Sequence, residues 1–271
     1  LVHPDEPPPR RRALKAALAR GLREVAEELK VSSVHVLFHP CADADEAPRE
    51  HPIETQADED AAALREAGFL RRLGVQFQWR NRGYRDFDDY LSRFNAKRRH
   101  MLRRERAEVA AQGVRVATRP GADLRPEDAA LMHRLYVSTV DKFYWGRRYL
   151  NLRFFELLID RVPDLLEFVV ATDGSEVLGG AINFAKAGRL YGRYWGQGER
   201  DVRFLHFEVC YYHSIAEAIA RGLHAFEPGA GGEHKVPRGF EPTLTASAHL
   251  VFDRRLGTLV RDHLRREESA I

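Results

Sequence analysis

Three strand-like runs in the middle of the chain are separated by two short turn signals. The runs are rich in β-branched and aromatic residues and cover residues 166–172, 176–185 and 189–195. Asp173-Gly174 and Ala187-Gly188 stand between them, and two-residue links of this kind close hairpins. We therefore expect a three-stranded antiparallel meander, which excludes an all-helical chain and a regular βαβ repeat.

Helical and strand patterns alternate along the rest of the chain. Leu14, Leu18 and Leu22 recur at helical spacing and predict a helix over 12–30, which a buried strand at 31–38 follows. Further helices are expected over 61–71, 86–112, 125–142, 152–161 and 204–221 and at the C-terminus, and further strands over 75–80, 114–118, 223–227 and 243–252. This order predicts a mixed α/β fold.

The composition is that of a soluble globular protein. The 271 residues are 44% hydrophobic and 31% charged, with a net charge of +3, and no apolar run approaches a membrane span. Cys41 and Cys210 stand far apart and the 12 histidines lack ligand spacing, so we predict neither a disulfide framework nor a metal site. The lack of a signal segment favours the cytoplasm, and the start at Leu1 suggests a longer gene product.

The segment from Arg93 to Arg106 concentrates basic charge. It carries seven basic residues and one acid, Glu105, so its net charge is +6 and the remainder of the chain is at −3. Such a patch is typical of a surface that meets phosphates, although a solvated helix face is the alternative. The candidate contacts with phosphate or RNA are Lys97, Arg98, Arg99, Arg103 and Arg106.

A glycine-rich loop stands between two predicted strands near the C-terminus. Its small residues, 229–232, let the backbone approach a ligand closely. The charged side chains that follow are Glu233, His234, Lys235 and Arg238. The loop is therefore a candidate site for a polar substrate, with a solvated strand connection as the alternative.

A second glycine motif follows the last strand of the meander. Arg193, Gly196 and Gly198 match the pattern R-x-x-G-x-G between a strand and a helix. In acetyltransferases this pattern cradles the diphosphate of coenzyme A with backbone N–H groups and a helix N-terminus. The sequence thus offers Gly196 and Gly198 as cofactor-binding candidates, against a plain glycine turn.

Two further features are candidates for site residues. Glu208 interrupts an otherwise apolar and aromatic helix stripe, where it serves either as a general base or as a cap of its own helix. Residues 141–150 form an aromatic and basic cluster that includes Tyr144 and Trp145. Core packing and one wall of a substrate cleft are the two interpretations of that cluster.

Together these segments resemble a bacterial family of predicted N-acyltransferases of peptidoglycan biosynthesis or recognition, related to the FemABX aminoacyltransferases of the GNAT superfamily. The resemblance covers nearly the whole chain, through residues 32–38, 76–79, 81, 83–84, 97–106, 141–150, 190–196, 205–212 and 229–240. Gln78 and Gly231 depart from the family pattern, which usually has His and Gln there. An additional N-terminal portion that members share is absent from this sequence.

The resemblance implies a GNAT-like acyltransferase fold, with tandem GNAT-like units of which the first is incomplete. We expect the remainder of the first unit and the basic helix over 1–112, and the second unit over 113–271. FemABX proteins transfer an amino acid from aminoacyl-tRNA to an amine of a peptidoglycan precursor. The resemblance therefore implies an amide formed by attack of an amine on an activated ester.

Amide formation needs a base, a proton donor and a group that stabilises the oxyanion. The family resemblance, together with the residue types, assigns Glu208 or Glu233 as base and Tyr211 or Tyr212 as proton donor. Lys235 and Arg238 are assigned to hold an anionic acceptor or to stabilise the oxyanion. The substrate-binding candidates are His234, Lys235, Arg238, Trp195, Arg193, Tyr144 and Trp145.

The acyl donor is left open between two candidates, aminoacyl-tRNA and acyl-CoA. A FemABX-type aminoacyl transfer uses the first, whereas a GNAT N-acetyltransferase built around Gly196 and Gly198 uses the second. A third interpretation is a non-catalytic module that recognises cell-wall fragments or nucleic acid. No cofactor beyond the donor is predicted.

Overall fold

The structure is a computed structural model that describes residues 2, 3, 5–40, 57–142, 144, 146–229 and 231–268. The chain forms two compact units, the first made of Leu1–Gln76 and Pro242–Ile271 and the second of Phe77–Glu241. This division differs from the expected one between residues 112 and 113. The basic helix lies in the second unit because it packs on the segment 208–212 of that unit.

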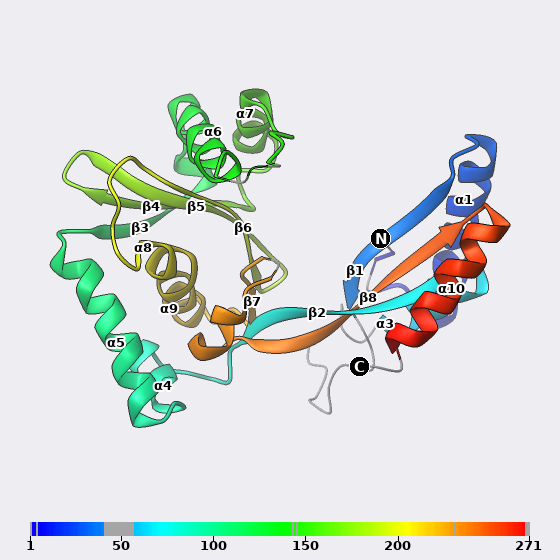
Figure 1. Cartoon of the computed structure of the whole chain (residues 1–271), viewed down its shortest axis with the longest axis horizontal. Helices are drawn as coiled ribbons and strands as arrows, with labels where there is room; N and C mark the ends of the chain where they lie inside the picture. Colours follow the sequence, from blue (N-terminus) through cyan, green and yellow to red (C-terminus); the bar gives the residue numbers. More distant parts are fainter. Residues whose placement is uncertain are drawn as a thin grey trace. The chain divides into compact units, whose positions relative to one another are not determined.

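The first unit combines a strand pair with helices. Its elements are α1 (Pro8–Glu28), β1 (Ser33–Pro40), α3 (Ala57–Glu66), most of β2 (Leu70–Arg80), most of β8 (Glu241–Val251) and α10 (Arg254–Glu268) (Figure 1). Strands β1 and β8 pair antiparallel from Ser33↔Val251 to Pro40↔Thr245. A small core of Ala19, Ala63, Ala67, Phe69, Ala248 and Leu250 lies between the helices and the strands.

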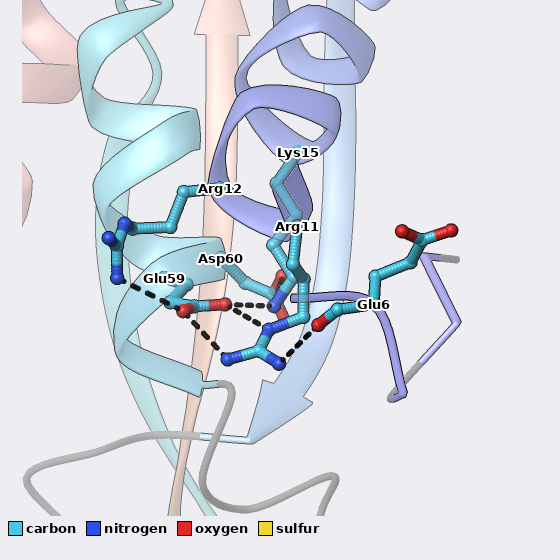
Figure 2. Close-up of polar contacts among 6 residues, drawn as sticks. All are labelled: Glu6, Arg11, Arg12, Lys15, Glu59 and Asp60. Carbon is cyan, nitrogen blue, oxygen red and sulfur yellow. Dashed lines mark hydrogen bonds and ion pairs between the residues drawn. The ribbon is translucent and has the colours of Figure 1, made fainter. Parts of the chain in front are cut away.

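Ion pairs join α1 to α3 at one end of this core, as Figure 2 shows. Lys15 is buried, and its Nζ lies 2.8 Å from Asp60 Oδ1 and 3.3 Å from Glu59 Oε2. Arg11 donates from Nε and Nη2 to the two oxygens of Glu59 at 2.8 and 3.0 Å. These bonds lower the pKa of Glu59, the hydrogen bond from Arg11 contributing most. The pairs fix the side of α1 that faces α3.

The leucines that predicted α1 lie on its exposed side. Leu14, Leu18 and Leu22 are exposed, whereas Ala19 and Ala26 face the core. Small side chains allow α1 to approach α3 closely. The helix itself was predicted correctly, but the leucines on which the prediction rested do not form its buried face. Within the described ranges, no helix combines the length and apolar character that crossing a bilayer requires.

The second unit contains the expected meander. Strands β3 (Arg115–Pro120), β4 (Leu166–Asp173), β5 (Glu176–Lys186) and β6 (Arg189–Gln197) lie in the order β6-β5-β4-β3, and each pairs antiparallel with its neighbour. Strand β7 (Ala225–Glu227) joins β6 in parallel and pairs with the end of β2 at Trp79↔Phe226. The prediction of three consecutive antiparallel strands is confirmed.

Helices cover both faces of this sheet, because apolar residues of β4 lie on both of its faces. Phe168 packs with Met132 of α6 (Pro126–Val140) and Phe155 of α7 (Leu152–Arg161). Val169, on the other face, packs with Val109 of α5 (Ala96–Ala111). In Figure 1, α6 and α7 accordingly lie on one side of the sheet, and α5 and α9 (His213–Ala220) on the other.

Two expected long helices are interrupted. The helix predicted over 86–112 is two helices in the structure, α4 (Phe87–Ser92) and α5. The second helix starts after Asn95, because this residue has extended backbone geometry and its side chain accepts a hydrogen bond from Arg98 N at 2.9 Å. The helix predicted over 204–221 consists of α8 (Leu205–Phe207), a π-helical turn η3 (Glu208–Tyr212) and α9. The π turn widens the helix where the site residues lie.

Candidate functional site

A cluster of aromatic and basic side chains forms where η3 meets η4 (Glu233–Arg238). We name it the Lys235 cluster and define it as Trp195, His206, Tyr211, His234 and Lys235. Lys235 is only 2% exposed, and its Nζ donates to the carbonyl oxygen of Gly229 at 2.6 Å. Burial lowers the pKa of Lys235 to about 8. The glycine-rich loop therefore supplies both the lysine and the carbonyl that holds it.

His234 and Tyr211 are joined directly in this cluster. His234 Nε2 and the Tyr211 hydroxyl lie 2.9 Å apart. Burial lowers the pKa of His234 and, together with nearby Cys210, raises that of Tyr211. Near neutral pH both groups are therefore uncharged, and either one can donate the proton of their shared hydrogen bond.

His206 completes the cluster from the helix side. Its ring centroid lies 5.3 Å from those of Trp195 and Tyr211. Burial, assisted by the positive charges of neighbouring basic residues, lowers the pKa of His206 to about 4. His206 was not among the candidate site residues predicted from the sequence, and the structure places it beside Trp195 and Tyr211. Within the described part of the chain, no three His, Cys, Asp or Glu side chains are grouped so that they could hold a metal ion.

Arg238 is held in a buried network next to the cluster. Its Nη2 donates to both carboxylate oxygens of Glu105 at 2.9 and 2.8 Å, and its Nε donates to the Tyr212 hydroxyl at 2.7 Å. The Tyr212 hydroxyl in turn donates to Glu105. The guanidinium lies 3.4 Å over the ring of Phe207, and Nη1 donates to the backbone oxygen of His234 at 2.8 Å.

This network positions η4 and does not open toward a ligand. Arg238 and Tyr212 were expected among the substrate-binding and catalytic residues, but their polar atoms bond to each other and to Glu105. Glu105 had been counted only as the one acid of the basic helix. Glu105 lies on the same face of α5 as Leu102 and Val109, which are both buried, and this spacing could have indicated that Glu105 is buried too.

Glu208 is paired in the structure. The residue is 7% exposed, and its carboxylate accepts three hydrogen bonds from Arg106, the shortest from Nη2 at 2.9 Å. Arg106 also lies over the Phe87 ring at 4.3 Å. Glu208, the expected base, and Arg106, an expected phosphate contact, are therefore paired with each other. Neither residue belongs to the Lys235 cluster.

The other basic residues of α5 differ in their contacts. Arg99 donates to the Phe94 carbonyl oxygen at 2.9 Å, and Arg103 pairs with Asp88 at 2.9 Å. Arg98 lies 6.0 Å from the centre of the Phe94 ring, and Lys97 is exposed. The basic face is therefore partly engaged within the protein.

The two glycines of the R-x-x-G-x-G motif have packing roles. A Cβ at Gly196 would overlap the carbonyl oxygen of Leu135, so only glycine lets β6 pass α6 there. A Cβ at Gly198 would lie 2.5 Å from Val177 O, and the Gly198 N–H bonds to Leu178 O at 2.8 Å. That N–H is therefore occupied, and α8, the next helix, has only three residues.

The remaining candidates lie apart from these contacts. Glu233 is exposed at the start of η4, and Arg193 is exposed on β6 with its guanidinium 5.5 Å from the Tyr194 ring. Tyr144 is 91% exposed, which does not agree with core packing, and Trp145 lies outside the described residues. Of the loop residues, His234 is bonded to Tyr211, and Lys235 lies close enough to His206 for its charge to lower the pKa of that histidine.

Comparison with known proteins identifies the family and similar folds. A family described as FemAB-like, peptidoglycan biosynthesis/recognition, matches residues 5–271. The crystal structure of FemX is 11% identical, with a TM-score of 0.58 over 92% of this chain and 79% of that one. L-PGS from Bacillus licheniformis is 10% identical, with a TM-score of 0.53 over 75% and 68%.

The C-terminal domain of a putative lysylphosphatidylglycerol synthetase from Agrobacterium fabrum is also similar in structure. It is 10% identical, with a TM-score of 0.52 over 69% of this chain and 64% of that one. At such identities the likeness concerns the fold, and the expected FemABX-like fold is confirmed. No curated protein matches the sequence.

Proposed function

Because the chain belongs to the FemAB-like family of peptidoglycan biosynthesis/recognition, we propose that it is an acyltransferase whose reacting site is the Lys235 cluster. The reaction is the attack of an amine on an activated acyl ester. The C–N bond forms, the C–O bond of the ester breaks, and an amide and an alcohol leave. Aminoacyl-tRNA is the proposed donor, and an amine of a peptidoglycan or peptide precursor is the proposed acceptor.

The observation that carries the proposal is the buried, cationic Lys235. With a pKa of about 8 it is mostly protonated at neutral pH, and its ammonium has two further protons besides the one given to Gly229 O. A cation in a site of low dielectric constant stabilises the oxyanion that forms when the amine attacks. Lys235 is therefore assigned to the oxyanion.

The pair of His234 and Tyr211 is assigned to proton transfer. Both are uncharged near neutral pH, and their hydrogen bond lets a proton enter at one group while another leaves from its partner. The pair takes the proton of the attacking amine and delivers one to the departing oxygen. Glu233, exposed beside His234, is the second candidate for the base, whereas the Arg106 bonds occupy Glu208.

Two features support tRNA over coenzyme A as the donor. The Gly198 N–H that a diphosphate would require bonds to Leu178. Lys97, by contrast, is exposed at the start of α5, where it can reach a phosphate. The contact residues proposed for RNA are Lys97, Arg98 and Arg99.

Trp195 and Arg193 are proposed to bind the acyl and acceptor groups, and Tyr144 and Trp145 are proposed to form one wall of the substrate cleft.

A transfer assay tests the proposal. Radiolabelled aminoacyl-tRNA or acyl-CoA is incubated with the chain and a peptidoglycan precursor, and the label in the precursor is measured. We expect transfer from aminoacyl-tRNA, reduced by about 10²-fold in Lys235→Met and unchanged in Lys186→Met, which alters an exposed lysine of β5. Transfer from acyl-CoA but not from aminoacyl-tRNA would overturn the proposal that aminoacyl-tRNA is the donor. Binding of the precursor without any transfer would instead indicate a recognition module.

A further inference from the structure

An open cavity of about 500 Å³ lies in the second unit, apart from the Lys235 cluster. It is lined by residues of α4, α5, β3 and the helical segment that follows α8. None of the five residues of the cluster lines it. Its charged and aromatic lining includes Phe87, Asp88, Arg103, Arg106, Glu208 and His213.

The charged lining of this cavity consists of two ion pairs. Arg103 Nη2 lies 2.9 Å from Asp88 Oδ1, and Arg106 Nη2 lies 2.9 Å from Glu208 Oε1. Both cations come from α5, whereas the two acids come from α4 and η3. A ligand in the cavity thus meets positive and negative groups side by side.

The two pairs differ in burial. The side chains of Arg103 and Asp88 are 56% and 78% exposed, so a ligand can exchange with either partner at little cost. Glu208 is buried and receives three hydrogen bonds from Arg106, so this pair is a fixed part of the wall. The exchangeable charges are therefore one carboxylate and one guanidinium.

The rest of the lining is apolar. Leu91, Val109, Val114 and Val116 contribute aliphatic surface, and Phe87 contributes an aromatic ring. His213, also at the wall, is held through its Nε2 at 2.8 Å from Thr118 Oγ1, and burial lowers its pKa. A neutral His213 adds no third charge near pH 7.

We propose that this cavity binds a free α-amino acid with an apolar side chain. The carboxylate of the ligand pairs with Arg103 and its ammonium pairs with Asp88, so each exposed group exchanges one partner for another of equal charge. The side chain lies on the aliphatic surface of Val109, Val114 and Val116. The volume falls in the range of small-molecule sites. The inference does not depend on the proposed transfer reaction.

Calorimetric titration of the whole chain with three ligands tests the site. L-leucine contains both charges, 3-methylbutylamine lacks the carboxylate, and 4-methylpentanoate lacks the ammonium. We expect leucine to bind at least about tenfold more tightly than either analogue, because each loses a charged hydrogen bond. Equal binding of one analogue, or no binding of leucine at millimolar concentration, would overturn the proposal.

Variants locate the binding. Asp88→Asn and Arg103→Gln, both at exposed positions, are expected to weaken leucine binding by about tenfold each. Arg104→Gln is the matched control, since Arg104 is exposed on the same helix and does not line the cavity. Ala107→Trp fills the cavity and should abolish binding with the thermal unfolding curve retained. Unchanged binding in Ala107→Trp would place leucine elsewhere and refute the site.

Discussion

Arg238 and Glu105 form a buried ion pair, in which Arg238 Nη2 donates to both carboxylate oxygens, although the two residues lie 133 positions apart in the sequence. Arg238 is 6% exposed and Glu105 is 4% exposed. The pair connects η4, which carries His234 and Lys235, to the basic helix α5. Its geometry therefore decides where the Lys235 cluster lies in the second unit.

Removing one partner of this pair should destabilise the protein strongly. In Arg238→Met, Glu105 stays buried without its cation, and we expect the free energy of unfolding to fall by about 3–5 kcal/mol. Urea denaturation followed by circular dichroism measures the loss. Arg103→Met, which breaks the exposed pair with Asp88, should cost under about 1 kcal/mol. Similar losses in the two variants would contradict the difference in burial.

Lys235 should make a contribution to the stability of the protein that increases with pH. Its pKa is lowered from 10.5 to about 8, so between these values the unfolded chain binds more protons than the folded one. The free energy of unfolding then increases with pH across this window, on the order of 1–3 kcal/mol for this group. Lys235→Met should remove that increase. Parallel pH profiles of the variant and the parent protein would show that the lysine is not desolvated.

His206 should make the protein sensitive to mild acid. Its pKa is lowered from 6.5 to about 4, so the unfolded chain takes up a proton between these values and the folded chain does not. The free energy of unfolding therefore decreases as pH falls from 6.5 to 4. We expect a smaller decrease in His206→Phe, measured by chemical denaturation at several pH values. His213 and His234, whose pKa values are also lowered, remain in both proteins and cancel in the comparison.

A methyl group at Gly196 should disturb the fold rather than a cofactor site. In Gly196→Ala the new Cβ overlaps the Leu135 carbonyl oxygen, so α6 or β6 has to move. We expect a loss of about 1–3 kcal/mol or more in the free energy of unfolding. Gly21→Ala is the control, since nothing lies within 4 Å of a Cβ there. A stable Gly196→Ala protein would reopen the coenzyme A interpretation.

Local patterns were enough to predict the three-stranded meander of the sheet. Asp173-Gly174 and Ala187-Gly188 carry the φ > 0 glycines that close the meander, and helix α7 has the predicted bounds. The break at Asn95 also had a local signal, because asparagine is a common N-cap, but the basic run beyond it continued the helical pattern. The π turn at 208–212 depends on tertiary packing and had no signal of its own.

The site was only partly predictable, because its charges are paired across long distances in the sequence. The loop pointed correctly to Lys235 and His234 as neighbours, but nothing local indicates that Arg238 pairs with Glu105 or that Arg106 pairs with Glu208. Both pairs join α5 to segments about 100 or more residues away. An excess of charge predicts a surface, whereas the specific partners depend on the fold.

The neighbouring positions of Glu105 and Arg106 on α5 give the helix a defined register. One residue pairs with Arg238 of η4 and the next with Glu208 of η3, in opposite sense. If α5 shifted by one residue, Arg106 could approach Arg238, or Glu105 could approach Glu208, and like charges would then meet in a buried setting. The two pairs thus favour a single register of α5. The helix is held there by the ion pairs that it forms and also by the repulsion between like charges that any shifted register would cause.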